Sequence, residues 1–219
     1  MKKPLAIAGA GAAAVAAIVL WSVFAGGADA AAPTPSSNNG TTASVSVVPT
    51  EAGPGWAWEP MTLAANMITA IPVHPDHGPS QRDGSWRGGW THDPLGALGA
   101  AATLSVTIDI SEKQVQSHAI DGPFKAETAA FAQRGTSTTR SGGTPQLVGF
   151  WFNAYNDQQA SIQLAYSGGP QYQLALETVQ LQWIDGDWRA QVGENRATVA
   201  HVSVDKLPTG FIPWQAPRS

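Results

Sequence analysis

Residues 172–192 read YQLALETVQLQWIDGDWRAQV, and this stretch decides the fold. Apolar residues alternate with Gln and Glu through its first half, which is the pattern of a β-strand with one buried face. Asp185-Gly186 is a dipeptide typical of a tight hairpin turn, so residues 187–192 are expected to return as an antiparallel strand. Trp183 and Trp188 then lie equally far from the turn and are expected to meet across the hairpin.

Two more strands are predicted just upstream, over residues 147–155 and 160–166, with the turn pair Asn156-Asp157 between them. Together with the 172–192 hairpin they form an antiparallel meander. A short helix or strand is expected near residues 200–207, followed by a tail that ends in Trp214.

Helices are predicted before the meander. Asp93 can cap a helix that starts at Pro94, and apolar residues then recur at helical spacing. Further helices are expected around residues 111–118 and 122–134, and a loop over residues 134–144. Residues 60–81 contain four prolines and are expected to be mostly extended or irregular. Helices followed by strands indicate an α+β fold, with the helices packed in a curved, cone-shaped antiparallel sheet.

The first 32 residues predict a membrane segment. Met1-Lys2-Lys3 is followed by an apolar run rich in Ala and Gly over residues 4–28, and the next Lys or Arg is Arg82. This order predicts a cytoplasmic N-terminus and a C-terminal domain outside the cell membrane. The length of the run favours a retained single-pass anchor, since a span needs about 20 residues. Ala28-Asp29-Ala30 offers the small residues that a signal peptidase cuts, so a cleaved signal peptide and a secreted protein are the alternative.

Composition indicates the domain organisation and excludes some classes of function. Residues 33–55 are rich in Pro, Ser, Thr, Asn and Gly, so they are expected to form a flexible linker to a single domain over residues 56–219. The whole chain has a net charge of −4. Without Lys2, Lys3 and Asp29, it keeps 10 of its 12 basic and 15 of its 16 acidic side chains, which gives −5. Such a domain is a poor candidate for nucleic-acid binding, which needs a basic stripe. The absence of Cys excludes disulfides and thiol chemistry.

Candidate chemical groups are few. His74-Pro75-Asp76-His77 brings two imidazoles and a carboxylate into four residues, but Pro75 disrupts any helical face that would aim both rings at one metal. Asp109, His118 and Asp121 could supply an Asp–His pair in a small-molecule pocket, although such groups more often sit on solvated helix ends. No nucleophile elbow, phosphate-binding loop or zinc-protease helix is present. No catalytic, cofactor-binding or metal-binding residue is therefore assigned.

The chain has nine tryptophans. Most are expected in the core, because Trp is usually highly buried. Trp56, Trp58, Trp86 and Trp90 lie outside the strongest predicted elements, and aromatic residues are enriched at binding hot spots. These four are the candidates for a contact surface with a protein partner.

Several blocks of the chain resemble an actinobacterial family of membrane-anchored proteins of unknown function. The blocks are Gly78-Pro79 and residues 89–98, 100–102, 148–150, 179–189 and 210–214. The set covers about residues 56–214 in order. By shape the family is similar to the cone fold of the nuclear-transport-factor-2 superfamily. Its nearest analogues are the TcpC-like, single-pass components of conjugative and type IV secretion machines, which is an analogy at the level of fold.

The resemblance and the N-terminal segment together imply a scaffold or assembly component. We expect a non-enzymatic protein held in the cell membrane through residues 4–28, with its domain outside, that either binds a protein partner or associates with further copies of itself. The alternative is a secreted cone-fold protein that binds or converts a ligand in the interior of the cone. A packed, apolar interior would count against that alternative.

Overall fold

The computed structural model of this protein describes residues 48–62, 68–134, 146–167, 174–194 and 201–216. All of them belong to one compact unit, Ala43–Ser219. The segment assigned above to an anchor or signal peptide lies outside the described residues, as do most of the expected linker and nearly all of the 134–144 loop. Among the described residues, no helix is both long and apolar enough to cross a membrane.

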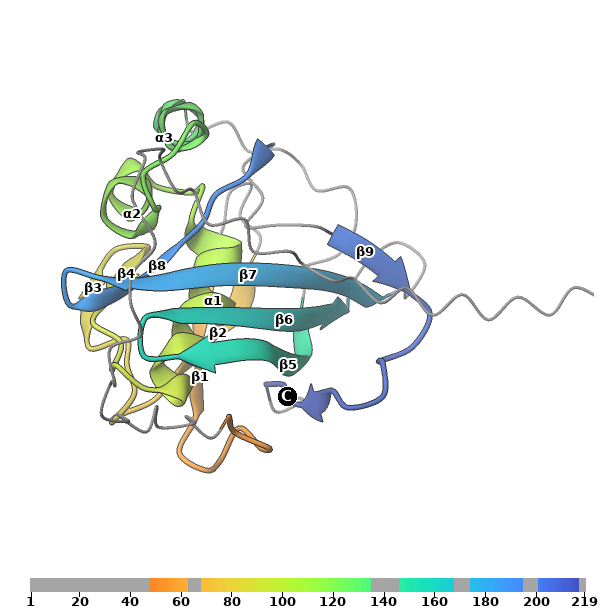
Figure 1. The fold of residues 1–219 in the computed structure, drawn as a ribbon. Coiled ribbons are helices and arrows are strands. Elements are labelled where there is room, and N and C mark those ends of the chain that lie inside the picture. Colours follow the sequence, from red (N-terminus) through yellow and green to blue (C-terminus); the bar gives the residue numbers. More distant parts are fainter. Residues whose placement is uncertain (1–47, 63–67, 135–145, 168–173, 195–200, 217–219) are drawn as a thin grey trace, which may run out of the picture. The chain divides into compact units, whose positions relative to one another are not determined.

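The predicted meander is present, and the α+β class is confirmed. Strands β5 (Gln146–Asn156), β6 (Gln159–Ser167), β7 (Leu174–Ile184) and β8 (Asp187–Ala190) pair antiparallel in chain order. The short β10 (Ile212–Pro213) adds to the outer edge of β5, and β9 (His201–Val204) pairs with β7. Figure 1 shows the long strands β5, β6 and β7 side by side in this six-stranded sheet.

The hairpin between β7 and β8 forms at the predicted dipeptide. Asp185 and Gly186 both have positive φ angles, +53° and +83°, as a two-residue type I′ turn requires. Trp183 and Trp188 are cross-strand partners, with ring centroids 5.3 Å apart in an edge-to-face arrangement. Arg189 of β8 forms an ion pair with the turn, because its Nη2 lies 2.5 Å from Asp185 Oδ2.

Helix α1 (Pro94–Thr107) is the centre of the packing. Asp93 caps it by accepting a 2.7 Å hydrogen bond from Gly96 N–H, and Pro94 opens its first turn, as predicted. Twelve of its fourteen residues are buried, so the helix is covered on all sides. It contacts β6, β7 and β8 of the large sheet and also β2 and β4. Glycines and alanines at the start of α1 allow this close approach.

Two further helices follow at the predicted places with shorter bounds. Helix α2 (Glu112–His118) is capped by Ser111 Oγ, which accepts from Gln114 N–H at 3.1 Å, and helix α3 is Lys125–Gln133. The two helices pack on each other, and α2 also contacts β8.

Two small hairpins precede α1, and the first lies largely in the segment 60–81 that was predicted to be mostly extended or irregular. Strand β1 (Ala57–Thr62) pairs with β2 (Ile68–Val73), and β3 (Gln81–Asp83) pairs with β4 (Trp86–Gly88). Pro60 and Pro72 are tolerated because both strands of a two-stranded sheet are edge strands, where a missing N–H can face away from the partner.

The folded part begins earlier than the sequence indicated. Ala52 belongs to the hydrophobic core, and its carbonyl accepts a 2.7 Å hydrogen bond from the Trp56 indole N–H. Pro54 O lies 3.1 Å from His74 Nε2. The last residues of the expected 33–55 linker therefore pack against the domain.

Gly96→Ala tests the packing of α1. Alanine is normally about 1 kcal/mol better than glycine inside a helix. Here a Cβ would lie 2.1 Å from Thr91 O, so we expect the substitution to lower the free energy of unfolding by about 1–3 kcal/mol. Chemical denaturation measures the change. Gly122→Ala is the control: its Cβ meets Gln191 Nε2 at an unstrained 3.6 Å, so it should leave stability unchanged.

The partly buried phenol of Tyr155 leads us to expect that the protein loses stability at alkaline pH. Burial, with repulsion from Asp157 and Asp93, raises the pKa of its phenol to about 12. The unfolded chain ionises this group near pH 10, so the stability that the neutral phenol contributes is fully present below pH 10. It falls as the pH rises from about 10 to about 12. The difference between the ultraviolet titration curves of the protein and of Tyr155→Phe should show a phenol that ionises about two pH units above the ordinary value of about 10. A difference curve centred near pH 10 would contradict the assignment.

Candidate functional site

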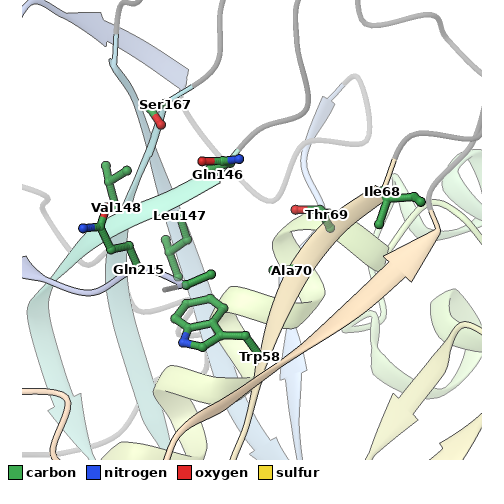
Figure 2. Close-up of a pocket in the computed structure, with 10 residues that line it drawn as sticks. Trp58, Ile68, Thr69, Ala70, Gln146, Leu147, Val148, Ser167 and Gln215 are labelled. Carbon is green, nitrogen blue, oxygen red and sulfur yellow. The ribbon is translucent and has the colours of Figure 1, made fainter. Parts of the chain in front are cut away.

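An open cleft of about 450 Å³ lies between the β1–β2 hairpin and the start of β5. One wall is formed by Trp58 of β1 with Ile68, Thr69 and Ala70 of β2. Figure 2 shows these residues opposite the second wall, with the Trp58 ring at the lower end of the cleft. The volume is in the range of small-molecule sites.

The second wall comes from residues far away in the sequence. Gln146, Leu147 and Val148 begin β5, Ser167 ends β6, and Gln215 follows β10 (Figure 2). None of the ten residues that line the cleft is ionisable. Its polar groups are two side-chain amides and two hydroxyls, all of which can both donate and accept hydrogen bonds.

An aromatic cluster supports Trp58 from behind. Its ring lies 5.4 Å from that of Trp214, which in turn makes edge-to-face contacts with Trp56 at 4.9 Å and Phe150 at 5.6 Å. Phe150 is fully buried, and the backbone N–H of Trp214 donates to Val148 O at 3.1 Å. Trp58 is therefore fixed by packing while one part of its ring lines the cleft.

The four tryptophans predicted as a contact surface separate into two groups. Trp56 and Trp58 lie together beside Trp214. Trp86 is half-buried and donates its indole N–H to Ser117 Oγ at 2.8 Å. Trp90 is 2% exposed, so its assignment to a contact surface is wrong. It lies in the core because the chain turns inward there to begin α1.

Trp151 is the exposed tryptophan that the sequence analysis missed. Its side chain is 42% exposed, whereas Phe150 and Phe152 on either side are buried. Alternation along a strand places neighbours on opposite faces, so a strand with two buried phenylalanines had to present Trp151 outward. This alternation was a signal that sequence reasoning could have used.

The candidate Asp–His pair forms with a different carboxylate. His118 Nε2 lies 3.1 Å from Asp187 Oδ2, while Asp121 instead pairs with Lys125 at 2.9 Å. Asp187 also accepts backbone hydrogen bonds from Gly89 at 2.7 Å and from Trp90 at 3.2 Å. Its carboxylate therefore joins β8, residues 89–90 and α2.

Gln114 fixes the orientation of the His118 ring. Its Oε1 accepts from Arg87 N–H at 3.0 Å and its Nε2 donates to Arg87 O at 3.1 Å, which determines the direction of the amide. The second hydrogen on Nε2 points to His118 Nδ1, 3.1 Å away. Nδ1 is consequently an acceptor, and the Nε2–H of His118 is the group that donates to Asp187.

Ser117, His118 and Asp187 have the residue types of a hydrolytic triad, since Ser117 Oγ lies 2.7 Å from His118 Nδ1. Their surroundings do not suit catalysis. The serine hydroxyl also lies 2.6 Å from Lys113 O and accepts from the Trp86 indole. His118 is 2% exposed between the rings of Trp86 and Trp90, so no substrate can reach it. The network is a structural junction.

The His74–His77 pair has structural partners too. The two rings lie 4.5 Å apart, and His77 Nδ1 is 3.0 Å from Asp93 Oδ2. Burial would raise the pKa of Asp93, but hydrogen bonds from Gly96, Thr91 and His77 favour its carboxylate form and leave that pKa below the usual value. No group of three metal-ligating side chains occurs among the described residues.

These features define an α+β domain with an uncharged surface cleft and an internal polar junction. Residues 23–213 match the family described as a domain of unknown function, DUF8175, and the chain belongs to that family. No curated protein and no solved structure is detectably similar to it.

Asp187→Asn tests the junction. Both Gly89 N–H and His118 Nε2–H donate to Oδ2, and an amide nitrogen in place of that oxygen cannot accept either bond. We expect the free energy of unfolding to fall by about 2–4 kcal/mol. Asp83→Asn is the matched control, because Asp83 is exposed and pairs only with Lys113 among the described residues; it should leave the melting temperature unchanged. Equal melting temperatures for the two variants would contradict the junction.

Proposed function

We propose that the protein is a membrane-anchored scaffold whose α+β domain lies outside the cell membrane and acts through protein contacts. The support for export is the order of Lys2-Lys3 followed by the uncharged run over residues 4–28. The setting that we propose is a conjugation or type IV-like secretion complex.

The proposal includes a cone fold of the nuclear-transport-factor-2 type. Two features support it: α1 packs on the antiparallel sheet, and the pairing of β5 with β6 shifts register after Leu147 and after Phe152. Such irregularities bend a strand and increase its twist.

A packed interior argues for binding at the surface. Leu98 and Leu104 of α1 are fully buried, as are Phe150 and Ile162 of the sheet. These side chains fill the space between α1 and the sheet. The alternative of a secreted protein with a ligand inside the cone therefore has less support.

The observation that carries the proposal is the exposure of Trp151. A tryptophan 42% exposed on a sheet face is costly in water and is the residue type most enriched at protein-binding hot spots. Its cross-strand partner on β6 is Gln163, and its ring also lies beside Gly210, yet 42% of the residue stays exposed. A partner, including a second copy of the chain, would bury this ring.

Site-specific photocrosslinking in intact cells tests the proposal. Trp151 is replaced by the photoreactive residue p-benzoylphenylalanine, which preserves an aromatic group, and the same residue replaces the exposed Gln116 of α2 as a control. We expect a light-dependent crosslink in the membrane fraction from position 151 and none from position 116. Trp151→Ala, with a crosslinker placed at Asn153, should reduce the yield several-fold.

Two results would contradict this function. One is a protein that stays monomeric and free of crosslinks at both positions. The other is an equal yield from positions 151 and 116, which would indicate random collisions.

A further inference from the structure

We propose that the cleft between β2 and β5 binds an uncharged oligosaccharide. This inference is separate from the protein contact at Trp151, because the cleft is lined by different residues and needs no partner protein.

The absence of charge in the lining selects the ligand class. Among the described residues, none of the ten that line the cleft is ionisable, so a nucleotide, an acidic peptide or a lipid phosphate would lose water there without gaining an ion pair from them. A neutral ligand avoids this desolvation cost. The cleft is also not purely apolar, because Gln146, Ser167 and Gln215 line it.

The distribution of polar and apolar groups matches a sugar. A sugar ring has apolar C–H faces and a rim of hydroxyls, each of which both donates and accepts hydrogen bonds. Trp58 offers an apolar aromatic surface, while the amides of Gln146 and Gln215 can both donate and accept. Figure 2 shows Gln146 and Trp58 at different ends of the cleft, so a ligand with several hydroxyls can reach both.

The site is largely pre-organised. The Trp58 ring packs against the Trp214 ring, and the backbone N–H of Trp214 is hydrogen-bonded to Val148 O of β5. Little conformational freedom of the indole is therefore lost when a ligand binds. Exposed amides such as Gln146 and Gln215 then supply adaptable hydrogen bonds around a rigid aromatic group.

An extended peptide finds only a short pairing edge on the β5 side of the cleft. Strand addition needs a free edge with several backbone groups. At Gly149 and Phe150, β5 is paired on both sides, with β6 and with β10, and Val148 O accepts from the backbone N–H of Trp214. Next to the cleft, β5 therefore offers only Gln146 and Leu147, which is a short edge for a strand ladder.

Calorimetric titration of the native protein tests the inference. The protein is purified with its N-terminus as the cell leaves it, in dodecyldimethylamine oxide, since a detergent with a sugar headgroup would compete. The probes are maltohexaose, cellohexaose and mannohexaose, with hexagalacturonate and an uncharged, end-capped hexapeptide as comparators. We expect at least one neutral saccharide to bind with a Kd of about 1 mM or tighter, and both comparators to bind at least ten-fold more weakly.

Cleft variants locate the binding. The double variant Gln146→Ala/Gln215→Ala removes two exposed side chains outside the core and should weaken binding about ten-fold or more. Ala70→Phe fills the cleft from β2 and should abolish it, with folding checked by circular dichroism. Gln116→Ala, an equivalent change on α2, should have no effect. Failure of all three saccharides, preference for the peptide, or binding unaffected by both cleft variants would overturn the inference. None of these outcomes depends on the crosslinking result at Trp151, so each proposal can fail without the other.

Discussion

The carboxylate of Asp187 is the interaction on which the rest of the structure depends. It is the first residue of β8, and it accepts hydrogen bonds from Gly89, Trp90 and His118. Two of these donors lie 97 and 98 residues earlier in the chain. One side chain thus joins the meander to the hairpins before α1 and to α2.

This junction determines the direction of α1. Trp90 is held by Asp187, and Thr91 O accepts from the indole of Trp188 at 2.9 Å. Asp93 caps α1 two residues later, so the start of the helix is fixed relative to the sheet. Because α1 then fills the space against β6, β7 and β8, room for a ligand remains at the border between the large sheet and the β1–β2 hairpin. The position of the cleft is therefore a consequence of the packing.

The parts of the fold that could be predicted are those set by neighbouring residues. Asp185-Gly186 determines its own turn, and Asp93-Pro94 determines its own helix start, so the predictions of this turn and of this helix start were correct. The β3–β4 pairing was missed because three-residue strands carry no periodicity. Asp187 was assigned to a hairpin, and its role as an acceptor could not be inferred because its partners come from distant segments. The cleft was missed for the same reason, since β2, β5 and Gln215 meet only in the folded chain. Trp90 was misassigned because local sequence does not show which way a loop turns.

The proposed binding role and the proposed position of the domain outside the membrane are linked through residues 1–32. If that segment is retained in the proposed topology, Trp151 and the cleft are presented at the outer face of the membrane. There a weak contact gains strength from the high local concentration of anchored partners. If the segment is removed, the same surfaces are in free solution and weak contacts are lost by dilution.

The most direct test is therefore mass spectrometry of the native N-terminus, in membranes and in culture fluid. The account predicts an intact protein that starts at Met1 or Lys2 and is found in the membrane fraction. A mature form that starts near Ala31 or Pro33 and is found in the fluid would contradict the anchored scaffold.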